Sequence, residues 1–273
     1  MISKIFIMLC RFSPKLKVIL WKRWYQFLAK AYHQREDWNF MNYGYAPLNG
    51  GKEKLNLNDE DEENRYSAFL YHHVASAVEL KGLNVLEVGS GRGGGADYIK
   101  RYLKPKTMTG VDFSENAVKF CNKKYADNGF SFKVGRAESL PFPDNSFDAV
   151  VNVESSHCYG SFDSFLAQVK RTLREGGHFL FADFRKRERV PVLREQIRNS
   201  GLTIVKETDI TLNVVEALKL DSERRLSLIK ENTFKPLIKS FCQFAGTEGS
   251  RIYEKFRSRE AAYVSFVLKK QTT

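Results

Sequence analysis

The sequence predicts an α/β fold: a doubly wound, mostly parallel sheet of seven strands, with an N-terminal helical arm and a helical insertion that forms a lid. Two observations lead to this fold class. Short apolar runs alternate with helix-length segments from residue 64 onward, which is typical of parallel strands joined by crossover helices. A cluster of glycines directly follows the first apolar run, as at a parallel strand that ends beside a bound ligand.

The elements are expected in the following order. Strands are predicted at 84–88, 107–112, 130–134, 147–153, 178–183, 202–207 and 261–268. Helices are predicted at 64–79, 96–102, 115–125, 162–173 and 190–199, with a helical stretch at 213–258 that breaks near Pro236 and at 246–249. Residues 37–66 are expected to form a loop, and residues 175–177 a turn. The last two strands leave no room for a crossover helix before the chain ends, so we expect an antiparallel closing pair with the helical stretch inserted between them.

The organisation and composition indicate a globular protein. Residues 1–63 are expected to form an arm and loop, and residues 64–273 the sheet domain with its insertion at about 213–258. The 273 residues are 42% hydrophobic, which is enough for a substantial core and excludes disorder of the whole chain. The four cysteines form no CxxC pair, which argues against a zinc site and against a disulfide framework. We therefore expect a cytoplasmic protein that holds no metal.

The net charge of +12 is concentrated near the N-terminus. No acidic residue precedes Glu36, whereas eight basic residues do, namely Lys4, Arg11, Lys15, Lys17, Lys22, Arg23, Lys30 and Arg35. Apolar residues are interspersed among them over residues 1–30, as in a basic amphipathic helix that lies on a lipid surface or packs on its own domain. No run is long enough to span a membrane. Peripheral membrane contact through residues 1–30 is therefore one of two open interpretations.

The segment from Glu87 to Gly95 carries the clearest functional signal. Five of its last seven residues are glycine, which permits a tight turn and close approach of a ligand to the backbone. The helix that follows offers its N-terminal amides to an anionic group. Asp112, at the tip of the next strand, is placed to bind ribose hydroxyls. A GxGxxG pattern also suits NAD, but the carboxylate of Glu87 favours a cofactor that carries an ammonium and a sulfonium.

These motifs resemble those of the class I S-adenosylmethionine (SAM) dependent methyltransferases. Four segments carry the resemblance: 87–93, 110–114, 135–142 and 173–177. Three further segments resemble the phthiotriolone/phenolphthiotriolone dimycocerosates methyltransferases, which methylate a hydroxyl of a very long lipid: 39–45, 152–159 and 182–185. The resemblance runs from about Trp38 to Arg185. It implies a Rossmann-like fold, SAM as cofactor and S-adenosylhomocysteine as product.

The resemblance also implies a set of cofactor-binding residues. The expected set is Glu87, Gly89, Ser90, Gly91, Gly93, Asp112, Phe113, Ala137, Glu138, Asn152 and Tyr43. Arg136 replaces the aspartate that usually contacts adenine, so the next two residues are expected to hold the base. Tyr43 belongs to an aromatic group with Trp38 and Tyr45, whose rings either stabilise the sulfonium or pack the arm on the domain.

His157 is the expected catalytic base, because it follows the fourth strand, where substrate and cofactor meet in such folds. Glu154 is expected to orient His157 or to bind the acceptor; alternatively, His157 only hydrogen-bonds its own loop. The predicted function is O-methylation of a hydroxyl on a hydrophobic or lipid-like molecule by in-line displacement. The apolar stripe of the 213–258 insertion and the aromatic arm are expected to wall the acceptor cavity.

Other reactions remain as alternatives, including methylation of another kind of small molecule. A sterol-type C-methyltransferase is possible, because related enzymes carry a glutamate at the position of Glu154. A nucleic-acid methyltransferase is disfavoured, since no NPPY-like sequence follows the fourth strand and no nucleic-acid-binding module is recognisable. The sequence leaves the oligomeric state open.

Overall fold

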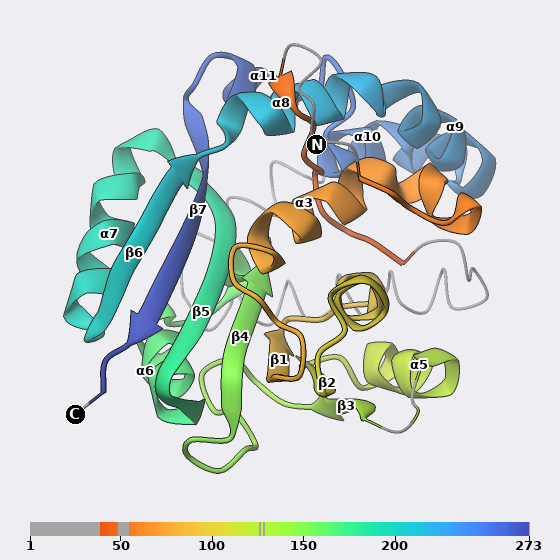
Figure 1. The fold of residues 1–273 in the computed structure, drawn as a ribbon. Helices are drawn as coiled ribbons and strands as arrows, with labels where there is room; N and C mark the ends of the chain where they lie inside the picture. The colour runs from red at the N-terminus through yellow and green to blue at the C-terminus, as the bar shows by residue number, and fades with distance from the viewer. Residues whose placement is uncertain (1–38, 49–54, 126, 128, 273) are drawn as a thin grey trace.

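Seven strands form one sheet in the order β3-β2-β1-β4-β5-β7-β6 in the computed structural model, which describes residues 39–48, 55–125, 127 and 129–272 (Figure 1). The strands are β1 (Asn84–Val88), β2 (Thr107–Asp112), β3 (Phe130–Val134), β4 (Phe147–Val153), β5 (Leu173–Lys186), β6 (Leu202–Asp209) and β7 (Ala261–Lys270). β7 runs antiparallel to both β5 and β6, whereas the first five strands pair in parallel. The predicted mostly parallel sheet with an antiparallel closing pair is confirmed.

The described helices pack on both faces of this sheet. They are η2 (Asp59–Asn64), α3 (Arg65–Ala75), α4 (Gly94–Tyr98), η3 (Ile99–Leu103), α5 (Glu115–Tyr125), η4 (Ser156–Cys158), α6 (Phe162–Thr172), η5 (Arg187–Arg189), α7 (Val190–Asn199), α8 (Thr211–Leu220), α9 (Ser222–Asn232), η6 (Lys235–Leu237), α10 (Ile238–Ala245) and α11 (Arg251–Arg257). Alternate strand residues such as Val150 and Val151 enter two separate apolar clusters, because successive side chains point to opposite faces. One cluster packs on α3, α4 and α5, and the other on α6 and α7.

Three local predictions differ from the structure. The predicted loop 37–66 contains the helix η2, where Arg101 forms two 2.7 Å hydrogen bonds with the carboxylate of Asp61. The predicted helix 96–102 begins at Gly94 and passes into the π-helical turn η3. The predicted turn 175–177 lies inside β5, where the register with β4 shifts between Phe147 and Ala149. For η2 and for the start of β5, contacts with a distant segment override the local pattern.

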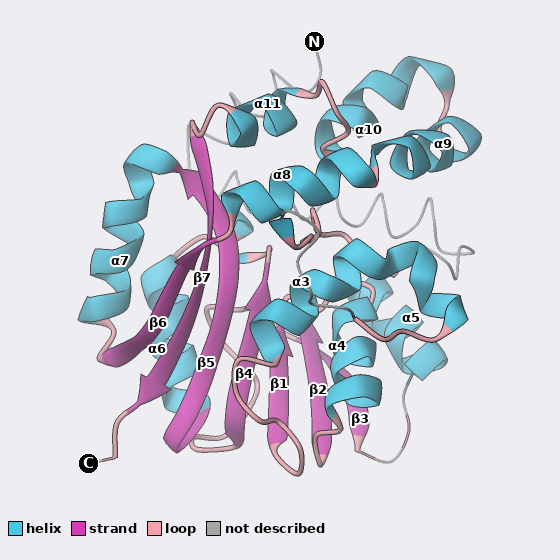
Figure 2. Cartoon of the chain, turned by 45° about the horizontal axis from the view of Figure 1, so that its top comes forward, coloured by secondary structure: helices cyan, strands magenta, loops and turns pink. Residues whose placement is uncertain are grey.

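The inserted helices α8 to α11 lie between β6 and β7 in the chain and beyond the carboxyl ends of the parallel strands (Figure 2). This confirms the predicted helical insertion. The segment 39–48 runs beneath them and is held by backbone hydrogen bonds from Tyr45 N to Tyr66 O and from Ala46 N to Asn213 O. The expectations for residues 1–30 and for Trp38 lie outside the described residues.

Candidate functional site

A cavity with about 870 Å³ of space, part of it open to solvent, lies at the carboxyl ends of β1, β2 and β4. Its walls are the glycine loop after β1, the end of β2, the loop after β4 and the segment 39–42. This is the edge at which α/β sheets bind their ligands. Of the predicted site residues, the cavity brings together Gly89, Ser90, Gly91, Asp112, Phe113 and Glu154.

The glycine loop is shaped by close backbone approaches. Gly89 has φ +78°, and a Cβ atom there would overlap the side chain of Ser155. A Cβ atom at Gly95 would overlap the ring of Tyr71, so α3 packs directly against the start of α4. Gly93, which was predicted to contact the cofactor, does not line the cavity. It lies directly before α4 and has φ +82°. Glycine is therefore required both for the turn and for the packing around it.

Glu87 lies fully buried at the end of β1, behind the loop. The hydroxyl of Tyr71 donates a 2.6 Å hydrogen bond to Oε1, while Oε2 has no partner within the described residues. Burial raises the pKa of Glu87 to about 8, against the opposing effect of the Tyr71 hydrogen bond. Ser90 Oγ, on the cavity wall, is also buried without a partner in the described part of the chain. Two buried oxygens without a partner in the described residues, one on the cavity wall and one behind the glycine loop, fit a site that binds a polar ligand group.

Glu87→Gln is expected to change how stability depends on pH. The folded protein holds the proton of Glu87 up to about pH 8, whereas an unfolded chain releases it near pH 4.5. The contribution of this group to the free energy of unfolding is therefore fully present below pH 4.5 and is lost as the pH rises towards 8. The loss is at most about 5 kcal/mol. Glutamine can still accept from Tyr71 but cannot ionise. The thermal unfolding temperature of the variant should therefore fall less than that of the wild type between about pH 5 and pH 8. If the unfolding temperatures of the variant and the wild type fell equally with pH, this account would be wrong. Glu154, whose pKa is raised in the same way, is present in both proteins and so does not affect the difference between them.

Asp112 presents its carboxylate to the cavity from the end of β2. Its Oδ2 accepts from Gly91 N at 3.0 Å and its Oδ1 from Ser114 N at 2.8 Å. Burial raises the pKa of this group, although the backbone amides counteract the effect. A carboxylate can accept about four hydrogen bonds, so two backbone contacts fix its position and leave capacity for ligand hydroxyls. Phe113 lies next to it on the cavity wall.

The predicted adenine contacts are not on the cavity wall. Ala137 is buried in an apolar cluster, and Glu138 Oε1 accepts from Gly160 N at 2.7 Å. Asn152 also lies behind the wall, where its Nδ2 donates to Tyr159 OH and to Ser155 Oγ, each at 2.8 Å. Ser155 and Tyr159 line the cavity, so Asn152 holds two side chains of the cavity wall in place.

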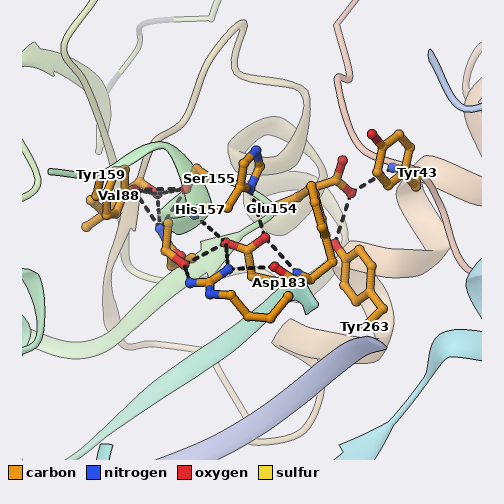
Figure 3. Close-up of polar contacts among 12 residues, drawn as sticks. Tyr43, Val88, Glu154, Ser155, His157, Tyr159, Asp183 and Tyr263 are labelled. Atoms are coloured by element: carbon orange, nitrogen blue, oxygen red, sulfur yellow. Dashed lines mark hydrogen bonds and ion pairs between the residues drawn. The ribbon is translucent and has the colours of Figure 1, made fainter. Parts of the chain in front are cut away.

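The carboxylate of Asp183 holds the imidazole of His157, as Figure 3 shows. Its Nδ1 is 2.9 Å from Asp183 Oδ1, and its backbone N donates to Oδ2 at 2.8 Å. Asp183, fully buried, also accepts from Ser156 Oγ at 2.6 Å and pairs with Arg185 at 3.1 Å. His157 does not itself line the cavity, but its neighbours Ser155 and Cys158 do.

This arrangement fixes the charges of the pair. Burial opposes a charge on His157, but the Cys158 and Asp183 side chains outweigh burial and raise its pKa to about 10. Burial likewise opposes the charge on Asp183, yet His157 and Arg185 hold its pKa well below the usual value. Asp183 therefore stabilises an imidazolium and orients the ring.

Glu154 makes different contacts from those predicted. Its backbone adopts φ +49°, and its Oε2 accepts from Tyr43 N at 2.8 Å and from Tyr263 OH at 3.0 Å (Figure 3). Asp183 is the residue that contacts the imidazole of His157, whereas Glu154 hydrogen-bonds to Tyr43 and Tyr263. The predicted role of Glu154 in orienting His157 therefore has no hydrogen bond behind it in the described residues, and its alternative role, binding of the acceptor, stays a prediction. Asp183 belongs to the segment 182–185 that carries the family resemblance, and it ends the predicted strand 178–183, which was the sequence signal for its role. Burial raises the pKa of Glu154 to about 8, with the Tyr43 amide acting in the opposite direction.

The segment 39–42 lines one side of the cavity, whereas Tyr43 is not part of the lining. The ring of Tyr43 packs on Phe184 and Phe256, with ring centroids 5.6 Å apart in each case. Arg225 of α9 donates to Asn42 O at 3.2 Å and to Tyr43 O at 3.3 Å. The structure thus places the ring of Tyr43 in the protein core, away from the cavity wall.

The insertion supports this segment and supplies none of the described residues that line the cavity. Val214 and Leu218 pack into the main core, and Ile229 and Phe241 form a small separate cluster. The prediction that the apolar stripe walls the acceptor cavity is therefore not supported, because packing uses these side chains. No group of three or more candidate metal ligands occurs in the described part of the chain.

Comparison with known proteins agrees with this geometry. Residues 86–181 match the methyltransferase domain family. The chain is 38% identical over 230 residues to the fatty-acid O-methyltransferase of Mycolicibacterium smegmatis, covering 84% of this chain and 82% of that protein. It is 34% identical over 247 residues to the phthiotriol/phenolphthiotriol dimycocerosates methyltransferase of Mycobacterium tuberculosis, covering 89% of each.

Among solved structures, the cyclase SpnF has a TM-score of 0.73 at 19% identity, over 94% of this chain and 97% of its own, which shows a shared fold. The relatives of higher identity show the family, and the glycine loop with the two buried oxygens beside it agrees with them. The chain belongs to the class I SAM-dependent methyltransferases, in the family of the fatty-acid and phthiotriol dimycocerosates enzymes.

Proposed function

We propose that this protein is an O-methyltransferase that methylates the polar end of a hydrophobic, lipid-like acceptor beside His157 and Glu154. The observation that carries the proposal is the contact between His157 Nδ1 and the buried Asp183, next to a cavity with the features of a SAM site. The names of the two relatives, which refer to fatty acids and to phthiotriols, support a lipid-like acceptor.

The residues around the cavity have distinct parts in this proposal. When bound, SAM supplies an electrophilic methyl group. Glu87 would face the ammonium of the cofactor from behind the glycine loop, and Asp112 would accept from its ribose hydroxyls. Phe113 would offer an apolar ring to the base. The segment 39–42 covers the cavity and limits the access of water, which strengthens these polar contacts.

For a hydroxyl acceptor, His157 would act as the base. Asp183 holds Nδ1, which leaves Nε2 as the nitrogen that would take the acceptor proton during in-line transfer. The neutral imidazole is required for this step. Because Asp183 and Cys158 raise the pKa of His157, the neutral form becomes more abundant as the pH rises through the range above 7.

A carboxylate acceptor is the second candidate, favoured by that same raised pKa. An imidazolium beside the cavity would attract a fatty carboxylate, which is already ionised at neutral pH and requires no base. In that case His157 would position the carboxylate by charge. The product would be a methyl ester.

The pH dependence of kcat/KM separates the two candidates. With a long-chain alcohol as acceptor, the proposal predicts a rise of about one logarithmic unit per pH unit between about pH 7 and pH 9. With a fatty acid, kcat/KM should stay level and fall above about pH 10, where His157 loses its charge. His157→Gln should flatten both profiles. Identical profiles in the wild type and in this variant would remove His157 from the reaction.

We further propose that the enzyme meets its acceptor at a membrane surface through residues 1–30, whose basic and apolar composition suits anionic lipid. Within the described residues, no helix combines the length and the apolar character needed to cross a bilayer. Contact through the surface is therefore the form of membrane association that this proposal involves.

A further inference from the structure

The turn between α9 and α10 exposes an aromatic side chain. Phe234 is 76% exposed, the largest exposed fraction among the large apolar residues of the described chain. Thr233 separates it from the end of α9, and η6 begins at the next residue. Phe234 enters none of the three apolar clusters, although Ile229 and Phe241 on the adjoining helices form one of them. Packing within the described fold therefore does not account for this ring.

Cationic side chains surround the turn. Lys230, Lys235 and Lys239 are all exposed, and within the described residues no ion pair engages them. Glu231 is the one acidic residue between positions 230 and 239, so the turn carries a net charge of +2 from three lysines and one glutamate. An aromatic ring among lysines is complementary to an anionic lipid interface, where the ring enters the acyl boundary and the ammonium groups meet phosphates. A second copy of the same turn would be repelled by these charges.

The turn is coupled to the cavity through α9. Arg225, on the same helix, donates to the backbone oxygens of Asn42 and Tyr43, and the residues 39–42 wall the cavity. Both ribbon views place α9 and α10 beyond the carboxyl edge of the sheet, the edge that holds the cavity (Figures 1 and 2). A surface that binds this turn would therefore lie on the side of the molecule where the acceptor enters.

We propose that the α9–α10 turn is a membrane-contact element that inserts Phe234 into an anionic lipid surface. It acts in addition to residues 1–30 and does not depend on which acceptor oxygen is methylated. Its role is to hold the cavity edge at the source of the hydrophobic acceptor.

Vesicle flotation of the full-length protein tests this surface. The probe is vesicles of equal parts phosphatidylglycerol and phosphatidylcholine, compared with vesicles of phosphatidylcholine alone. Phe234→Ser should weaken binding to the anionic vesicles about tenfold, and Lys235→Glu together with Lys239→Glu by at least as much. The matched control is Val205→Ser, which changes a 58% exposed apolar residue on β6 and should bind as the wild type does.

Three outcomes would overturn the proposal. They are unchanged binding by Phe234→Ser, equal binding to the neutral vesicles, and a concentration-dependent dimer that Phe234→Ser abolishes, which would assign the turn to self-association. Turnover of a short, water-soluble acceptor should be unchanged in Phe234→Ser, since the turn lies outside the cavity. If the wild type did not methylate that acceptor at all, the result would count against the proposed function and not against the membrane contact.

Discussion

Asp112→Ala is expected to weaken SAM binding about 10- to 100-fold. The substitution removes the carboxylate that the amides of Gly91 and Ser114 hold at the end of β2, and with it the charged acceptor for ribose hydroxyls. Hydrogen bonds to a charged group of this kind contribute about 1.5–3 kcal/mol, which corresponds to this range of affinity. Titration calorimetry with SAM and with S-adenosylhomocysteine measures it.

Asp148→Ala is the matched control for this variant. Asp148 accepts from Asn84 N at 2.7 Å and pairs with Arg174, near the start of β4 and thus at the opposite edge of the sheet from the cavity. This variant should lose thermal stability and retain its affinity for SAM. Equal loss of affinity in both variants would show that Asp112 acts through general stability of the sheet and would refute its assignment to the cofactor.

His157→Ala is expected to lower kcat about 10²- to 10⁴-fold with a hydroxyl acceptor, while the Kd for SAM changes less than about twofold. The reason is that, in the proposed reaction, the ring would take the acceptor proton, and it does not line the cavity. Asp183→Asn should also lower kcat, because the ring would lose the carboxylate that orients it. This variant leaves Arg185 without its buried partner, so its folding must be checked by thermal unfolding.

His178→Ala provides the control for His157→Ala. His178 pairs with Ala149 and Lys269 in the sheet, away from the cavity, and its replacement should leave kcat within about twofold of the wild type. If His157→Ala were as active as His178→Ala at every pH, the acceptor proton would have to leave by another route and the assignment of His157 as base would be wrong.

Local patterns predicted the first half of the sheet closely. β1 to β4 have the predicted bounds. β1 and β4 are largely buried apolar runs, and β3 at the sheet edge alternates between buried and exposed residues, so each carries a strand pattern. The glycine loop and Asp112 were also predictable, since each lies at a strand end whose position the sequence defines. Residues that follow consecutive parallel strands meet at one edge, so their proximity follows from the fold class.

The parts that the sequence did not predict depend on contacts between distant residues. Tyr43 N and Glu154 Oε2 are 111 residues apart in the chain, and nothing near either residue indicates that they meet. The helix η2 depends in the same way on Arg101, 40 residues further along the chain. The assignment of Asp183 to His157 required knowing that β5 lies next to β4 and that η4 turns the imidazole towards it.

The central claim is that this chain transfers the methyl group of SAM to an oxygen of a lipid-like acceptor. Incubation with SAM that carries an isotopically labelled methyl group, followed by mass spectrometry of a long-chain alcohol and a fatty acid, tests it most directly. The proposal predicts one labelled methyl group on the oxygen of at least one acceptor, with an equal amount of S-adenosylhomocysteine. Label on carbon, or no labelled acceptor although SAM binds, would contradict it.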